Sequence, residues 1–218
     1  LYTCCILLFP VSAQQIPSFK ANDRIVFLGN SITEGGHYHS YIWLYYMTHF
    51  PELPLRIYNG GIGGDCASHM VFRFDSDIQI KKPTYLVCSF GMNDSGYDGY
   101  NKPGYDKYAN KQVEYANTEF GKLQQQILAD KKIKNVVLLG SSPYDENVKL
   151  EGVETLHGKN ETIKRIIEMQ AEVAQKRGWG FVNFNTVMCE LNKEIQQSDS
   201  TATFCGGDRI HPDKDGHM

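Results

Sequence analysis

The chain has 218 residues, of which 41% are hydrophobic and 22% are charged, a composition typical of a globular domain and unlike that of a disordered or membrane protein. Its net charge is −3 and it has no basic run longer than a Lys-Lys pair, so nothing indicates a nucleic-acid partner. The length suits one α/β domain with a substantial core.

The beginning of the chain resembles part of a secretory signal peptide. Leu1 to Phe9 form an apolar run, and the small residues of Val11-Ser12-Ala13 follow it, so we expect cleavage between Ala13 and Gln14. Such a signal predicts export to a periplasmic or extracellular space. The run is too short to span a bilayer, and its alternative interpretation is a buried N-terminal strand.

Five short apolar runs predict buried parallel strands. They are residues 24–28, 55–58, 84–90, 136–140 and 181–184. Helices are expected between them, because apolar residues recur at steps of three and four or because the stretch is rich in tyrosine. These helices are residues 37–49, 112–129 and 163–174. The alternation predicts βαβ units and a three-layer α/β/α flavodoxin-like sandwich around a five-stranded parallel sheet.

Residues 14–218 are expected to form this single domain. Gly178 marks the expected end of the last long helix. Residues 213–218 have the pattern of the first turn of a further helix, so the domain looks truncated at its C-terminus.

Three polar motifs follow directly after predicted strands, and a fourth lies near the C-terminus. They are Gly29-Asn30-Ser31-Ile32-Thr33, Gly60-Gly61-Ile62-Gly63-Gly64-Asp65, Gly91-Met92-Asn93-Asp94 and Asp208-Arg209-Ile210-His211-Pro212. Sheets of this class bind ligands beyond the C-terminal ends of their strands. Together the motifs supply a serine, a glycine, an asparagine and a histidine with an acid three residues before it, which are the groups that acyl transfer needs.

In this order the four motifs resemble those of the SGNH hydrolases, also called the GDSL family, over nearly the whole chain. The resemblance implies a serine-dependent carboxylic ester hydrolase without metal or cofactor. It implies that Ser31 is the nucleophile, that His211 is its base and that Asp208 orients the histidine. One departure is Asn30, because the family usually has Asp before the serine.

The resemblance also implies an oxyanion hole formed by the N–H groups of Ser31 and Gly64 and by the side chain of Asn93. Gly63 is the neighbouring register for the glycine. Each residue also has a structural alternative: a helix cap for the serine, a turn for the glycine and an Asx turn for the asparagine.

Four cysteines follow the predicted cleavage site: Cys66, Cys88, Cys189 and Cys205. Cys88 lies inside an apolar run and is expected to be a buried free thiol. Cys189 and Cys205 are the best candidates for a disulfide in an exported protein. His37 and His39 fall on a predicted helix and are expected to be surface residues or residues at the rim of the site.

A loop rich in glycine and tyrosine, residues 95–105, follows Asn93 directly. Tyr97, Tyr100 and Tyr105 could stack on sugar rings, or they could pack the loop onto the domain. With the predicted export, this loop favours removal of O-acetyl groups from carbohydrate. The alternatives are a lysophospholipase or short-chain lipase, which would need an apolar acyl groove, and a catalytically silent carbohydrate-binding domain.

Overall fold

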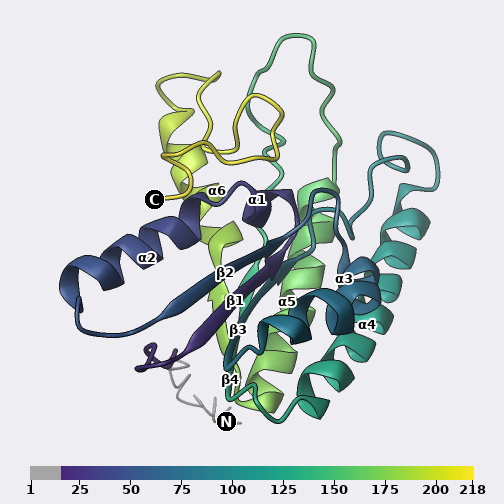
Figure 1. The fold of residues 1–218 in the computed structure, drawn as a ribbon. Coiled ribbons are helices and arrows are strands. Elements are labelled where there is room, and N and C mark those ends of the chain that lie inside the picture. The colour runs from purple at the N-terminus through teal and green to yellow at the C-terminus, as the bar shows by residue number, and fades with distance from the viewer. Residues whose placement is uncertain (1–15) are drawn as a thin grey trace, which may run out of the picture.

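The computed structural model describes residues 16–218, so the predicted signal peptide and its cleavage site lie outside the described residues. The centre of the structure is a five-stranded parallel sheet with the strand order β2-β1-β3-β4-β5 (Figure 1). Its strands are β1 (Arg24–Gly29), β2 (Arg56–Gly61), β3 (Tyr85–Phe90), β4 (Asn135–Gly140) and β5 (Gly180–Asn183). The five predicted strands are confirmed, and the largest difference is the longer C-terminal end of β2.

Helices cover both faces of the sheet, which confirms the three-layer sandwich (Figure 1). One face packs against α3 (Ala67–Arg73), α4 (Tyr105–Ala129) and α5 (Lys159–Arg177). The other face packs against α2 (His37–His49) and α6 (Phe184–Ile195). Successive residues of β1 alternate between the two cores, so the strand must be apolar on both faces.

The predicted helices are present, but α4 starts earlier than expected. It begins at Tyr105, directly after Gly104 in a left-handed conformation with φ 86°. Its first two turns are mostly exposed and polar, so they lack the apolar spacing that predicted the rest of the helix. Helix α5 ends at Arg177, and the predicted stop residue Gly178 is its left-handed C-cap, with φ 67°. Within residues 16–218, no helix is both long and apolar enough to cross a membrane.

The C-terminal ends of the strands carry the short elements that matter for function. Helix α1 (Ser31–Glu34) follows β1 at this end of the sheet. In Figure 1 the yellow C-terminal segment lies over the same end, close to α1.

A π-helical turn (Phe74–Ile78) and a 3-10 turn (Gln79–Lys81) complete the path from α3 to β3. Residues 213–218 form a turn in which the His217 N–H donates to the carbonyl of Asp213 at 3.1 Å.

Candidate active site

A chain of two hydrogen bonds joins the serine, histidine and aspartate predicted from the motifs. The Ser31 hydroxyl lies 2.7 Å from Nε2 of His211, although the two residues are 180 positions apart. Nδ1 of His211 lies 2.5 Å from Oδ2 of Asp208. Because the carboxylate accepts the Nδ1 proton, Nε2 is left with a lone pair facing the serine hydroxyl. This geometry lets the imidazole take a proton from Ser31.

The Asp208 carboxylate is held by more than the histidine ring. Its Oδ1 accepts the backbone N–H groups of Ile210 and His211, each at 2.9 Å. Burial alone would raise the pKa of Asp208, but the hydrogen bonds from His211 and Ile210 hold this pKa below its ordinary value. Asp208 is therefore ionised at neutral pH and can stabilise an imidazolium.

Arg209 anchors the loop that carries this acid and base. Its backbone is left-handed, with φ 69°, and its side chain is 2% exposed. The guanidinium donates to the carbonyl of Val148 at 2.6 Å and to that of Asp145 at 3.1 Å. The Asp145 N–H donates back to the Arg209 carbonyl at 3.0 Å. The Arg209 side chain therefore points away from Asp208 and His211, and its hydrogen bonds hold the loop that carries both residues.

Two backbone N–H groups are available as oxyanion donors. Ser31 is the first residue of α1, a position whose N–H has no partner within the helix. Gly64 is exposed and left-handed, with φ 78°, and a Cβ added there would meet nothing within 4 Å. Among the described residues, neither N–H is donated to another group. Gly63 lacks the left-handed backbone, so the structure favours Gly64 as the glycine that faces open space.

The Asn93 side chain is oriented by two contacts. Its Nδ2 donates to the carbonyl of Asp65 at 2.8 Å, and its Oδ1 accepts the Tyr97 hydroxyl at 2.8 Å. A carbonyl can only accept, so the nitrogen must face Asp65 and the oxygen must face Tyr97. An amide carries two N–H bonds, which leaves one of them for a substrate. The contact with Asp65 also joins the Asn93 turn to the Gly64 segment.

The buried Arg73 holds the strand ends in register with this segment. It donates from Nε to Asp65 at 2.7 Å and from Nη2 to the carbonyl of Gly60 at 2.7 Å. A longer contact of 3.3 Å reaches the carbonyl of Gly29, at the end of β1. One guanidinium therefore connects β1, β2 and the oxyanion segment.

The three tyrosines of the predicted binding loop are placed differently from one another. Tyr97 is 37% exposed beside Asn93. Tyr100 is only 2% exposed, and its hydroxyl donates to the carbonyl of Ser95 at 2.7 Å. Tyr105 belongs to α4 and donates to the carbonyl of Gly158 at 3.0 Å. The structure therefore assigns Tyr100 and Tyr105 to packing of the loop, and only Tyr97 remains beside the site.

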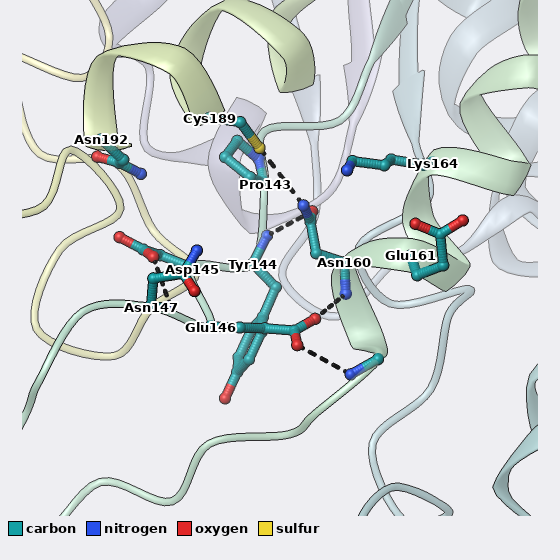
Figure 2. A pocket seen from close by; sticks show the side chains of 11 residues that line it. Pro143, Tyr144, Asp145, Glu146, Asn147, Asn160, Glu161, Lys164, Cys189 and Asn192 are labelled. Carbon is teal, nitrogen blue, oxygen red and sulfur yellow. Dashed lines mark hydrogen bonds between the residues drawn. The ribbon is translucent and has the colours of Figure 1, made fainter. Parts of the chain in front are cut away.

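Cys189 and Cys205, the candidates for a disulfide, are not bridged, because both thiols are free. Cys189 accepts from Nδ2 of Asn160 at 3.4 Å (Figure 2), and the buried Cys205 donates to the carbonyl of Pro143 at 3.4 Å. Each thiol has its own partners, and burial raises the pKa of both. The prediction for Cys88 is confirmed, since it is a fully buried free thiol.

The expectation for His39 is also wrong, because this residue is buried and lies neither at the surface nor at the rim of the site. Its Nε2 lies 3.2 Å from the carbonyl of Thr33, and its ring packs against that of Phe27. Helix α2 is apolar on most of its circumference, so the sequence pattern did not show which side faces the sheet.

The comparison with known proteins agrees with this geometry. Residues 27–218 match the GDSL-like Lipase/Acylhydrolase family. The chain belongs to this family. It is therefore an ester-bond hydrolase.

Individual relatives of the hydrolase extend the comparison. The hydrolase is 21% identical to an acetylxylan esterase from Geobacillus stearothermophilus over an alignment of 213 residues. This alignment covers 91% of this chain and 90% of that protein. It superposes on a gut microbial diltiazem-metabolizing enzyme with a TM-score of 0.91 and 49% identity, over 94% of this chain. The hydrolase spans only about half, 46%, of that enzyme's length. A mutant acetyl-xylooligosaccharide esterase from Geobacillus shares the fold, with a TM-score of 0.71 at 19% identity over 93% of this chain and 92% of that one.

Some residues around the site of the hydrolase were not predicted from the sequence. Arg73 and Lys159 received no role, and Arg209 was noted only as part of a motif. Within a helix or a polar loop, the local sequence around a charged residue that becomes buried looks the same as that around one that stays exposed to solvent. Their burial depends on carbonyl groups that distant segments supply.

The departure from the family at Asn30 has a structural explanation. Asn30 is buried, and its Oδ1 accepts the Ile32 N–H at 3.0 Å, which caps α1 beside Ser31. A carboxylate oxygen would make the same contact, and Asn and Asp are equally good N-caps.

We expect Asn30→Ala to lower the free energy of unfolding by about 1 kcal/mol, because the Ile32 N–H loses its partner. Asn30→Asp should keep the cap and retain activity within a few-fold of the parent. Urea unfolding of both variants measures the change in stability, and an esterase assay measures the activity of Asn30→Asp. An Asn30→Ala protein as stable as the parent would show that the cap contributes nothing.

Proposed function

We propose that the hydrolase cleaves its ester through a covalent acyl-enzyme on Ser31. The observation that supports this most is the continuous chain of hydrogen bonds from Ser31 through His211 to Asp208. His211 takes the serine proton as Oγ attacks the ester carbon, and then gives that proton to the leaving alcohol. A water activated by the same imidazole releases the acid and restores Ser31.

In this proposal three donors stabilise the negative charge that develops on the carbonyl oxygen. They are the N–H groups of Ser31 and Gly64 and the second N–H of the Asn93 amide. The charge of Asp208, kept ionised by its lowered pKa, stabilises the imidazolium that forms at the same time.

The proposed substrate is an O-acetyl group on a carbohydrate. The support is the acetylxylan esterase that aligns over most of both chains, together with the setting of Tyr97. Tyr97 is partly exposed next to Asn93, where an aromatic ring can face a sugar and its hydroxyls. The Tyr97–Tyr105 segment contains no aliphatic side chain that would line an acyl groove.

We expect acetate release from acetylated xylooligosaccharides to be at least about tenfold faster, in kcat/KM, than hydrolysis of aryl esters with eight-carbon or longer acyl chains. An aryl acetate and an aryl octanoate with the same aryl alcohol differ only in the acyl chain, so their comparison measures the acyl preference alone. Diltiazem, which carries an acetate ester, serves as an acetylated substrate without a sugar. Preference for aryl acetate without preference for the sugar ester would reject the carbohydrate part of the proposal alone.

A short-chain lipase is the second candidate, and one observation favours it. A cavity of about 410 Å³ lies beside Ile32 and Pro212, neighbours of the nucleophile and the base. Most of its surface is apolar, and its lining includes the aliphatic side chains of Leu139, Val182, Val187, Met188 and Leu191 from β4, β5 and α6. However, Ser31, Gly64 and Asn93 do not line this cavity. Faster hydrolysis of the octanoate than of the acetate would select this function instead.

A further inference from the structure

Lys159 is a fully buried cation that binds the turn carrying Asn93. It is the first residue of α5 and is 0% exposed. Its Nζ donates to the carbonyl of Met92 at 2.9 Å, to the hydroxyl of Ser95 at 2.6 Å and to the carbonyl of Gly96 at 2.6 Å. An ammonium has three N–H bonds, so these three acceptors use all of them. They lie on both sides of Asn93, and one side chain therefore fixes the turn before and after it.

The same ammonium holds the tyrosine that contacts Asn93. Nζ lies 3.8 Å from the centre of the Tyr97 ring, within the range of a cation–π interaction. The hydroxyl of that ring donates to Oδ1 of Asn93. Contact with Tyr97 orients the amide oxygen, and the carbonyl of Asp65 orients the amide nitrogen. The rotation of the amide is set from both ends.

We propose that Lys159 and Tyr97 are positioning residues that act through Asn93. Lys159 fixes the backbone of the turn and the Tyr97 ring, and Tyr97 fixes the amide so that its free N–H points to the developing oxyanion. Neither side chain needs to touch the substrate for this role. The inference rests on ester hydrolysis with Asn93 as an oxyanion donor, and it is independent of the carbohydrate substrate.

Other groups around Lys159 keep it in place. Glu146 accepts the N–H of Gly158 at 2.9 Å and that of Asn160 at 2.7 Å, so it caps the start of α5 on both sides of Lys159 (Figure 2). A carboxylate at a helix N-terminus satisfies free N–H groups and the helix dipole. The position of Nζ is therefore set by the helix end as well as by its own contacts.

The charges that face Lys159 partly compensate its burial. Burial lowers its pKa to about 7, and the negative charge of Asp94 opposes this shift. Asp94 accepts the N–H groups of Ala67 and Gly91, each at 2.8 Å, and burial raises its pKa to about 6. The rings of Tyr97, Tyr100 and Tyr144 surround Nζ at 3.8, 5.7 and 6.0 Å. Near neutral pH both the ammonium and the carboxylate are substantially populated.

A double-mutant cycle on 4-nitrophenyl acetate tests the proposal. The variants are Tyr97→Phe, Asn93→Ala and the double variant, with kcat and KM measured for each. Tyr97→Phe keeps the ring under Lys159 and removes only the hydroxyl. We expect it to lower kcat about tenfold, with KM changed less than about twofold, because a misplaced donor stabilises the transition state less. In the Asn93→Ala background the same change should alter kcat less than about twofold.

Lys159→Met completes the test with an unbranched side chain that cannot donate. Its effect on kcat should also be lost in the Asn93→Ala background. If this variant does not fold, the Tyr97 cycle decides alone. Matched controls are Lys164→Met, an exposed lysine on the same helix, and Tyr46→Phe, whose hydroxyl accepts the Phe19 N–H away from the site. Both controls should keep kcat within about twofold of the parent.

Three results would overturn the inference. Equal losses in kcat from Tyr97→Phe with and without the Asn93 amide would show that Tyr97 does not act through Asn93. A Tyr97→Phe variant with the kcat of the parent would show the same. If Asn93→Ala itself retained full activity, the role of Asn93 in the proposed mechanism would fail together with the inference. A large loss in Asn93→Ala with an additive cycle would reject only the positioning role.

Discussion

Replacing Ser31 with Ala should lower kcat on 4-nitrophenyl acetate by about 10⁴-fold or more, while the protein stays folded. The only hydrogen bond of the Ser31 hydroxyl among the described residues is the one to His211, so its loss removes the nucleophile and little else. The residual rate should come from the oxyanion donors, which do not depend on the hydroxyl.

Urea unfolding should place Ser31→Ala within about 0.5 kcal/mol of the parent, the usual range for a substitution outside the core. Ser198→Ala is a matched control, because Ser198 is an exposed serine whose hydroxyl donates to the Ile195 carbonyl. A serine-directed organophosphonate should modify Ser31, and mass mapping identifies the site. Activity within a few-fold of the parent, or modification of another serine, would contradict a serine mechanism on Ser31.

Replacing Asp208 with Asn should lower kcat by about 10³- to 10⁴-fold at neutral pH. The amide can still accept the N–H groups of Ile210 and His211, so the loop should keep its shape. It can also donate to Nδ1 and so hold the wrong tautomer of His211, and it has no charge to stabilise the imidazolium. Initial rates on 4-nitrophenyl acetate at saturating substrate measure the effect.

The pH dependence of stability offers an independent check on Asp208. Its pKa is lower in the folded protein than in the unfolded chain, so the carboxylate stabilises the fold above its unfolded pKa of roughly 3.9. This contribution is lost as the pH falls through the lower, folded value. The difference in stability between the parent and Asp208→Asn should therefore shrink on acidification below about pH 4.

Asp199→Asn is the matched control, because Asp199 also accepts a backbone N–H, from Thr201 at 2.9 Å, but it does not contact His211. It should leave kcat within about twofold of the parent. An Asp208→Asn protein with parental kcat would show that His211 needs no acidic partner.

Local sequence patterns were sufficient for most of the fold. Each strand is a short apolar run that must be buried on both faces, and the glycines at the ends of β1, β2 and β4 are visible without knowledge of distant residues. The spacing of Asp208 and His211 is also local, since one turn of chain brings the carboxylate to the ring. By contrast, the start of α4 was missed because its polar first turns carry no apolar period.

The sequence by itself determined the order of the five strands, three of the helices (α2, α4 and α5) and, through the motif resemblance, the residues of the hydrogen-bonded chain of Ser31, His211 and Asp208. The tertiary structure decided which of them meet and how they are held. Ser31 and His211 are 180 positions apart, and Lys159 is 67 positions from Met92. The partners of Cys189, Arg73 and Lys159 likewise come from other segments of the chain. Whether a charge is buried or a thiol is paired depends on what packs against it, and residue spacing along the chain does not contain that information.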